Sequence, residues 1–275
     1  MKNLVNYVNG KFADYKHSTI PAADLSVTRG LAVFEVIRTY NGKTNHLPLH
    51  LKRLEKSLKI VGMKLPKTKK EVTQIIKKLV QKNYRGTELT FQIIVTGGES
   101  KNKLLPKGRY GLVVLTSEVA RKFKSAVKLK TIHAKRMLPE AKITNYVPAI
   151  IAIQKARKEG FDDILYTNRK NVLESSTSNI FIIKGNQLIT PKSGVLEGIT
   201  RKIILEKVKL NLEKIERIVK IDEVYNADEV FITSSTRQLT PVVKVDSHVI
   251  SGGKPGLKTK EIKKKLNEYL NRINS

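Results

Sequence analysis

The sequence contains no cysteine and no tryptophan, and the first of these absences removes several kinds of chemistry. Without cysteine the chain can form no disulfide, no thiolate zinc site and no cysteine nucleophile. Long apolar runs are also missing, and the opening residues MKNLVNY turn polar too early for a signal peptide. We therefore expect a cytoplasmic protein that has no membrane partner.

Acidic and aromatic residues are scarce as well. The 275 residues include 53 lysines and arginines against 24 acidic residues, which gives a formal net charge of +29. Such a charge is the first sign of a nucleic-acid-binding protein. However, the basic residues are spread between the apolar positions of amphipathic helices, and only 6% of residues are aromatic and able to stack on bases. We therefore expect a solvated basic surface, with a nucleic-acid-binding protein as the alternative outside the enzymes.

The first part of the chain predicts strands and hairpins together with two amphipathic helices. Asn9-Gly10 and Asn41-Gly42 follow strand-like segments, and Asn-Gly is a strong signal for a two-residue hairpin turn. Apolar residues then recur at helical spacing in two segments, with Pro66 between them. The expected elements are strands at 4–8 and 33–40, helices at 50–61 and about 72–80, and strands at 89–96 and 112–116.

The segment 117–125, SEVARKFKS, is polar, basic and aperiodic, so we expect it to link a domain at 1–116 to a larger one at 126–275. The larger domain mixes strands and helices without a regular βαβ rhythm, and no internal repeat is visible. This pattern predicts the α+β class with two domains. The expected elements are strands at 127–133, 163–167, 172–173, 180–183, 187–190, 229–233 and 242–245, and helices at 148–159, 200–211 and about 262–270.

Three places have the composition of anion sites. In Gly194–Arg201 a glycine-bearing loop runs into a helix that begins near Thr200, and a helix start offers unpaired N–H groups. Residues 233–236 are four hydroxyl side chains directly after a strand. Arg53 lies on a predicted helix between two leucines. Each has an ordinary structural explanation: a helix N-cap, a hydrogen-bonded turn and a solvated arginine.

A lysine and a glutamate are the strongest candidates for chemistry. Lys142 precedes a nearly uncharged helix start, whereas most lysines of this chain have charged neighbours. We expect burial to depress its pKa, which would make the amine a nucleophile for carbonyl groups. Glu174 lies between two apolar segments and needs a partner such as backbone N–H groups or a protonated ring nitrogen. The spacing alone also allows a capping or salt-bridged lysine.

Other common catalytic patterns are absent from the sequence. The five histidines show no metal-ligand spacing with carboxylates, so we expect no metal site. We find no Ser-His-Asp arrangement, no P-loop and no dinucleotide-binding fingerprint. Lysine chemistry is therefore the main remaining route to covalent catalysis.

Taken in order, these segments resemble the class IV (fold type IV) pyridoxal-phosphate enzymes, which include branched-chain aminotransferases, D-amino-acid aminotransferases and aminodeoxychorismate lyases. The resemblance covers nearly the full length, and the order and separation of its short sequence motifs make it specific. The motifs are VFEVIR at 33–38, HLKRLEKS at 50–57, KITNY at 142–146, ESSTSN at 174–179, GITR at 198–201 and TSSTRQLTPV at 233–242. The resemblance implies an α+β fold with a small N-terminal α/β domain and a larger C-terminal pseudo-barrel domain, assembled as a homodimer.

The cofactor implied by this resemblance is pyridoxal 5′-phosphate. Lys142 would hold its aldehyde as an imine and then move the proton between the substrate Cα and the cofactor C4′. Glu174 would keep the pyridine nitrogen protonated, and Tyr146 would hydrogen-bond the phenolic oxygen. The residues that would bind the phosphate are Arg53, Ile199, Thr200, Ser235 and Thr236.

The resemblance also implies transfer of an amino group from an α-amino acid to a 2-oxo acid such as 2-oxoglutarate or pyruvate. The strand 89–96, the loop after it and the segment 174–183 are closer to the D-amino-acid enzymes. Phe34 and Asn145-Tyr146 are closer to the branched-chain group. We expect a D-amino-acid aminotransferase, with a branched-chain L-amino-acid aminotransferase and an aminodeoxychorismate lyase, which eliminates pyruvate, as alternatives.

Two positions bear on substrate binding. The D-amino-acid enzymes carry a carboxylate-binding arginine where this chain has Gly97, and the branched-chain enzymes carry a tyrosine where it has Arg29. We expect Arg29 to supply the missing carboxylate clamp from the partner subunit, and Phe34 to be an aromatic residue of the active site. A surface arginine in a loop is the alternative for Arg29.

Overall fold

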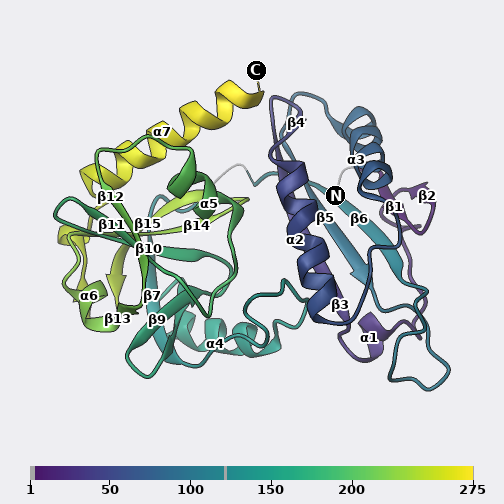
Figure 1. Ribbon diagram of the computed structural model, residues 1–275, viewed down its shortest axis with the longest axis horizontal. Helices are drawn as coiled ribbons and strands as arrows, with labels where there is room; N and C mark the ends of the chain where they lie inside the picture. The colour runs from purple at the N-terminus through teal and green to yellow at the C-terminus, as the bar shows by residue number, and fades with distance from the viewer. Residues whose placement is uncertain (1–3, 121–122, 275) are drawn as a thin grey trace. The chain divides into compact units, whose positions relative to one another are not determined.

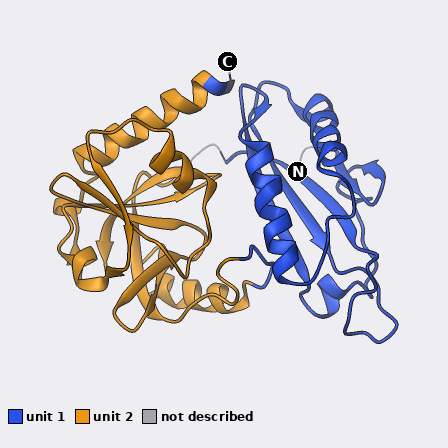
Figure 2. Ribbon diagram, viewed as in Figure 1, with its two compact units in different colours: residues 1–121, 141–145, 273–275 blue, residues 122–140, 146–272 orange. Residues whose placement is uncertain are grey.

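A computed structural model describes residues 4–120 and 123–274 of the chain. The chain forms two compact units, one of residues 1–121, 141–145 and 273–275 and the other of residues 122–140 and 146–272 (Figure 2). The short segment 141–145 belongs to the first unit although the preceding residues belong to the second. Of the expected linker 117–125, the first two residues continue strand β6 (Gly111–Glu118), and residues 121–122 lie outside the described residues.

The first unit is a six-stranded antiparallel sheet with two long helices packed against it (Figure 1). The strand order is β2-β1-β6-β5-β3-β4. The remaining strands are β1 (Asn6–Val8), β2 (Lys11–Ala13), β3 (Ala32–Tyr40), β4 (Lys43–Thr44) and β5 (Leu89–Thr96). The helices are α1 (Leu25–Thr28), α2 (Leu47–Ile60) and α3 (Lys69–Asn83).

Local sequence explains these elements. The turns at Asn9-Gly10 and Asn41-Gly42 have positive φ at both residues, which confirms the two predicted hairpins. Helix α2 buries a stripe of leucines at helical spacing, and α3 begins at a capping box formed by Thr68. Strand β5 has the predicted bounds 89–96 and is buried on alternate residues over most of its length. The apolar pattern thus specified the core of this unit.

The second unit is built on a ten-stranded sheet in the order β12-β11-β10-β14-β15-β7-β8-β9-β13, with β16 paired to β15. Strand β9 also pairs with β10, so the sheet closes on itself from β10 through β14, β15, β7 and β8 to β9. This closure is the expected pseudo-barrel. The strands are β7 (Val127–His133), β8 (Asp163–Asn168), β9 (Asn171–Ser175), β10 (Asn179–Lys184), β11 (Gln187–Pro191), β12 (Glu213–Arg217), β13 (Val219–Lys220), β14 (Glu229–Ser234), β15 (Gln238–Val245) and β16 (His248–Val249).

The helices of the second unit differ from expectation in more than one place: a helix at 221–225 was not predicted, the last helix begins at Leu257 instead of near 262, and the helix predicted at 200–211 is shorter. Helix α5 (Ile199–Glu206) ends before the predicted residue 211, and β12 follows it where no strand was predicted. The side chain of Lys214 donates to the carbonyls of Leu205 and Val208, which gives the end of the helix its hydrogen-bond partners. The other helices are α4 (Val147–Lys158), α6 (Ile221–Tyr225), the short η1 (Ser251–Gly253) and α7 (Leu257–Asn274).

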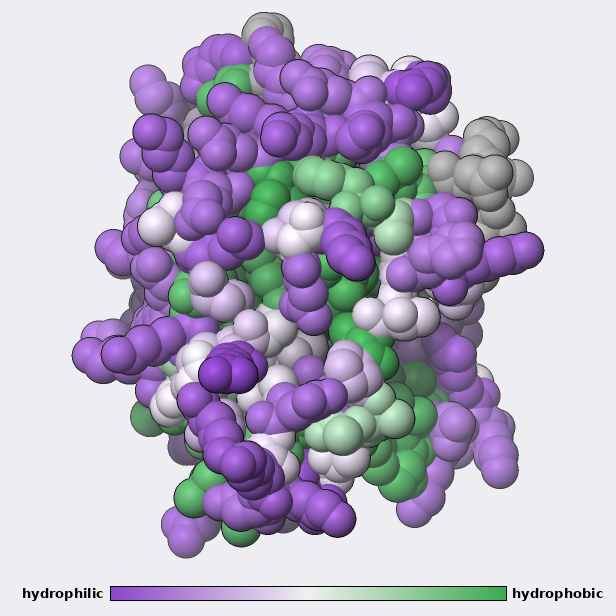
Figure 3. All heavy atoms as spheres, turned by 90° about the vertical axis from the view of Figure 1, so that its right-hand side faces the viewer, coloured by the Kyte–Doolittle hydropathy of each residue, from purple (hydrophilic) through white to green (hydrophobic). Residues whose placement is uncertain are grey.

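Together the two units confirm the predicted α+β fold class. Across the described residues 4–120 and 123–274, no helix has the length and apolarity that crossing a bilayer requires. The face drawn in Figure 3 is mostly hydrophilic around a smaller apolar area, which agrees with lysine-rich surface composition.

Candidate active site

Lys142 lies on a segment that the first unit holds through the backbone. Its N–H donates to the hydroxyl of Ser57 on α2 at 3.1 Å, and its carbonyl accepts from the N–H of Phe34 on β3 at 2.9 Å. The next residue, Ile143, forms a β-bridge with Val33. Both backbone groups of Lys142 are thus fixed by neighbouring elements, so the position from which its side chain projects is well defined.

The Lys142 side chain lies against an aromatic ring. Its Nζ is 4.6 Å from the centre of the Phe34 ring, within range of a cation–π contact. Phe34 is buried in β3, and Lys142 is half-buried. The structure therefore brings together two residues that the sequence singled out separately.

Arg53, on α2, is buried against β3 rather than solvated. Its Nε donates to Glu35 Oε1 at 2.7 Å and its Nη2 to Glu35 Oε2 at 2.8 Å, and the ring of His50 contacts the same Oε2 at 2.8 Å. Burial by itself would raise the pKa of Glu35, but the charge and hydrogen bonds of Arg53 outweigh it and lower that pKa to about 2. Burial lowers the pKa of His50, and nearby positive charges, including that of Lys142, act in the same direction. Glu35 is thus ionised and His50 neutral near pH 7.

Glu35 and His50 were not identified from the sequence. The available signal was the spacing of His50 and Arg53, which places both on one face of a helix. Their common partner, Glu35, lies inside the motif VFEVIR, where two apolar residues flank it on each side in a strand. A buried glutamate in a central position of a strand requires a partner of this kind.

Arg29 ends helix α1 in the first unit. Its side chain is exposed, and its Nη1 donates to the carbonyl of Thr28 at 2.8 Å. Gly97 explains why no arginine stands at the end of β5: a Cβ built there would lie 2.9 Å from Leu25 Cβ and 3.0 Å from Leu31 Cδ2. The loop that bears Arg29 therefore fills the space beside Gly97.

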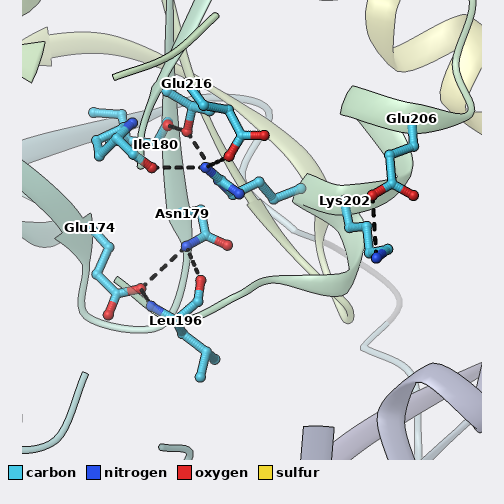
Figure 4. A network of polar contacts seen from close by, with 10 residues as sticks. Glu174, Asn179, Ile180, Leu196, Lys202, Glu206 and Glu216 are labelled. Atoms are coloured by element: carbon cyan, nitrogen blue, oxygen red, sulfur yellow. Dashed lines mark hydrogen bonds and ion pairs between the residues drawn. The ribbon is translucent and has the colours of Figure 1, made fainter. Parts of the chain in front are cut away.

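Glu174 lies at the barrel closure of the second unit and is 3% exposed. Its Oε1 accepts from Arg136 Nη1 at 2.9 Å, and its Oε2 accepts from the N–H of Leu196 at 3.1 Å and from Asn179 Nδ2 at 3.3 Å. Figure 4 shows the side chains of Glu174 and Asn179 pointing toward each other and toward the backbone of Leu196. Three donors, one of them a cation, suit a carboxylate that stays ionised when buried.

Arg136 is a further residue of this cluster that sequence reasoning missed. Its guanidinium carbon is 5.9 Å from the centre of the Tyr146 ring, so Arg136 contacts two predicted cofactor residues, Glu174 and Tyr146. Its side chain is 10% exposed. In the sequence it stands in a basic loop beside Lys135 and looks like any surface arginine, because nothing local indicates its partners.

The amino end of α5 is arranged to receive an anion. Gly198 is its N-cap and has no side chain with which to cap the first turn, and Thr200 is buried there. A Cβ at position 198 would lie 1.9 Å from Asn179 Oδ1, so the loop needs glycine to pack this closely. Asn179 Nδ2 also donates to the Leu196 carbonyl at 2.8 Å. Asn179 thus connects the helix start to Glu174.

The hydroxyl cluster lies at the turn between β14 and β15. Ser235 and Thr236 are half-buried there. Thr233, at the end of β14, pairs in register with Asn179, so their side chains share a face of the sheet. Among the described residues, the buried Thr233 Oγ1 has no hydrogen-bond partner, and such a group calls for a ligand or water. The hydroxyls, the uncapped helix start and the buried carboxylate fit a ligand that has both a phosphate and a basic ring nitrogen.

The comparisons with known proteins identify the family. The sequence matches the family Amino-transferase class IV over residues 32–245. The chain belongs to the class IV aminotransferases. Members of this family use pyridoxal 5′-phosphate, and a solved structural neighbour is bound to that cofactor. The predicted family, enzyme class and cofactor are thereby confirmed.

Individual class IV aminotransferases resemble this chain along nearly its whole length. A putative branched-chain-amino-acid aminotransferase of Methanocaldococcus jannaschii is 29% identical over 274 residues, which covers 95% of each chain. A D-alanine aminotransferase of Bacillus licheniformis is 30% identical over 271 residues and 94% of each chain. The crystal structure of a branched-chain aminotransferase from Thermoproteus uzoniensis with norvaline has a TM-score of 0.90 at 26% identity, covering 98% of this chain and 95% of that one. The named relatives thus include both substrate classes.

In residues 4–120 and 123–274, no group of three or more histidines and acidic residues is placed to hold a metal ion. The ionisable groups of the candidate site are instead paired with one another, as Glu35 is with Arg53 and Glu174 is with Arg136.

Proposed function

We propose that this class IV aminotransferase transfers the amino group of a D-amino acid to a 2-oxo acid such as 2-oxoglutarate or pyruvate. The observation that carries the lysine chemistry is the position of Lys142, whose backbone is fixed by Ser57 and Phe34 while its amine faces the Phe34 ring. An amine held in this way acts repeatedly at one point, which catalysis of proton transfer requires.

The cofactor supplies an electron sink for the pair left at the substrate Cα when its proton departs. Lys142 Nζ would hold the cofactor covalently and, once the substrate amine has displaced it, would move the proton at Cα. Glu174 would keep the proton on the pyridine nitrogen, and Tyr146 would bind the phenolic oxygen. The phosphate would be bound by the guanidinium of Arg53, by the first-turn N–H groups of α5 and by hydroxyl groups; the proposed α5 and hydroxyl residues are Ile199, Thr200, Ser235 and Thr236.

Arg29 is the proposed clamp for the substrate carboxylate. The crowding at Gly97 excludes an arginine there, and the residues that crowd it, Leu25 and Leu31, belong to the loop that bears Arg29. Replacing Arg29 with alanine should raise KM for the amino donor about tenfold or more and change kcat less. Arg85→Ala is the matched control, since Arg85 is also exposed and donates to carbonyls at its own helix end. An unchanged KM in Arg29→Ala would exclude the clamp.

The substrate proposal is tested by initial rates with a panel of D- and L-amino acids and 2-oxoglutarate. Faster turnover of D-amino acids supports it. Preference for L-valine, L-leucine or L-isoleucine would instead establish the branched-chain activity that the Methanocaldococcus jannaschii relative's name suggests. Release of pyruvate from aminodeoxychorismate without an acceptor would establish the lyase.

The proposal includes a homodimer in which Arg29 acts on the partner's site. Light scattering should give twice the mass of 31.0 kDa. At amino-donor concentrations far below KM, where both variants are slow, mixing Lys142→Ala with Arg29→Ala under conditions of subunit exchange should restore about one quarter of the wild-type activity, because about half of the dimers are mixed and half of the sites in each mixed dimer are intact. No restoration would place Arg29 and Lys142 of one site on the same subunit.

A further inference from the structure

Three ionisable side chains are buried together where α2 packs on β3 (Figure 1). Glu35 is 0% exposed, His50 2% and Arg53 7%. Removing such groups from water costs several kcal/mol for each ion, and a buried ion pair returns little net stability compared with apolar residues of the same volume. This unit has an extensive apolar core nearby, so the cluster calls for a reason other than stability.

The geometry shows what the cluster fixes. Glu35 engages one edge of the Arg53 guanidinium, through Nε and Nη2, in a two-pronged arrangement. His50 Nδ1 also lies 2.8 Å from Oε2, so two side chains of α2 hold the carboxylate in place. The plane of the guanidinium is therefore set, and its other edge, which includes Nη1, is directed away from Glu35.

The charges of the cluster balance. Glu35 stays ionised because its pKa is low, and burial keeps His50 neutral. The charge of Arg53 is therefore largely matched by Glu35 before any anion arrives. Arg53 then recognises an anion mainly by the direction of its N–H groups, and a change in that direction should weaken binding sharply.

From this arrangement we infer that Glu35 and His50 are positioning residues that hold Arg53 for the phosphate of the cofactor. They act through Arg53 and contribute specifically to affinity for a phosphorylated ligand. The inference rests on the proposed role of Arg53 in phosphate binding and adds the two residues that make that role effective.

The test compares two ligands that share a ring and an aldehyde and differ in the phosphate. Apoenzyme is titrated with pyridoxal 5′-phosphate and with pyridoxal, following the absorbance change on binding. Glu35→Gln should weaken pyridoxal 5′-phosphate binding by about 10- to 100-fold and alter pyridoxal binding less than about twofold. Glu55→Gln is the matched control, because Glu55 also lies on α2 but pairs with Lys69 on the surface. It should leave both affinities unchanged.

A second pair of variants covers the case in which Glu35→Gln does not fold. His50→Phe keeps an aromatic ring and removes the contact to Glu35, so binding of pyridoxal 5′-phosphate should weaken about 3- to 10-fold. His50→Asn places an amide donor near the position of Nδ1 and should restore most of that affinity. A structural role alone would not produce this rescue or the difference between the two ligands.

Two results would overturn the inference: equal weakening of both ligands in the Glu35 and His50 variants, or unchanged affinity for pyridoxal 5′-phosphate. Selective weakening supports it. If wild-type protein binds neither ligand, the proposed function itself fails, and that result is distinct because it appears before any substitution is made.

Discussion

Glu174 and Asn179 are directly opposite residues of β9 and β10, the two strands whose pairing closes the barrel. The Asn179 amide donates both to Glu174 Oε2 and to the Leu196 carbonyl, and its oxygen lies against Gly198 at the start of α5. One side chain therefore joins the carboxylate proposed for the ring nitrogen to the helix start proposed for the phosphate. Asn179 thus takes part both in the strand pairing that closes the barrel and in the contacts that connect the two ends of the proposed cofactor site.

Asn179→Asp should reduce kcat/KM at least 100-fold. It replaces a donor with a second carboxylate beside the buried Glu174, and two like charges in a poorly solvated place favour protonation of one of them. A protonated Glu174 would no longer hold a proton on the cofactor ring. The measurement is kcat/KM from steady-state kinetics, with Asn168→Asp as the control. Asn168 is an exposed asparagine at the end of β8, so this variant shows the effect of an added negative charge away from Glu174. Wild-type kinetics in Asn179→Asp would contradict it.

Arg136→Gln should lower both the free energy of unfolding and the affinity for the cofactor. The substitution leaves Glu174 buried without its cationic partner, and breaking such a pair costs about 3 kcal/mol or more. It also removes the contact with the Tyr146 ring. Urea unfolding and cofactor titration measure the two effects, and Arg157→Gln on the exposed face of α4 is the control. If Arg136→Gln and Arg157→Gln change both quantities equally, the Arg136–Glu174 pair contributes neither to stability nor to cofactor affinity.

Ser57→Ala should lower kcat several-fold and leave the cofactor phosphate bound. The Ser57 hydroxyl is fully buried and accepts the N–H of Lys142, so its loss leaves that N–H without this partner at a cost of about 1–3 kcal/mol. The amine of Lys142, which we propose as the catalytic group, then projects from a less fixed backbone. Single-turnover rates are the direct measurement, with the exposed Ser117→Ala in β6 for comparison. An unaltered rate would mean that Phe34 and the β-bridge alone hold the segment.

The free energy of unfolding should fall as the pH is lowered. The first loss comes from protonation of His50 and the second from protonation of Glu35. The pKa of His50 is lowered by burial, so the unfolded chain binds a proton first and stability is lost below pH 6.5. The pKa of Glu35 falls from 4.5 to about 2, so its contribution is present above pH 4.5 and is lost as the pH falls toward 2. That contribution is about 3 kcal/mol. Urea unfolding against pH should show both losses, and Glu35→Gln should abolish the lower one.

The sequence predicted elements well where one local pattern decided them. The apolar run of β5 and the Asn-Gly turns need no distant information, and their observed bounds agree with the expected ones. The end of α5 could not be predicted in this way. It involves Lys214, which belongs to the next strand and donates to the carbonyls of Leu205 in the helix and of Val208 just after it. A side chain from the next strand does not alter the spacing of apolar residues in the helix, so the sequence pattern does not show where the helix ends.

The candidate site shows the same division. Lys142 and Glu174 stand out because each is a charged residue beside apolar ones. Arg136 gives no such signal, since one partner, Glu174, lies 38 residues away and the other, Tyr146, lies at the far end of the same loop. Glu35 and His50 were visible in the sequence, but their importance depends on how α2 packs on β3, which a single sequence does not state.

The short segment 141–145 has a consequence for exchanging parts between related enzymes. The chain passes from one unit to the other after residues 121, 140, 145 and 272, so neither unit is a continuous stretch. A chimera joined near residue 121 would place one parent's Lys142 segment beside the other parent's β3 and Ser57. Recombination that preserves activity must therefore move 141–145 together with the first unit, as an insert within the second unit's gene segment. A single crossover point near residue 121 would separate Lys142 from the residues that hold its backbone.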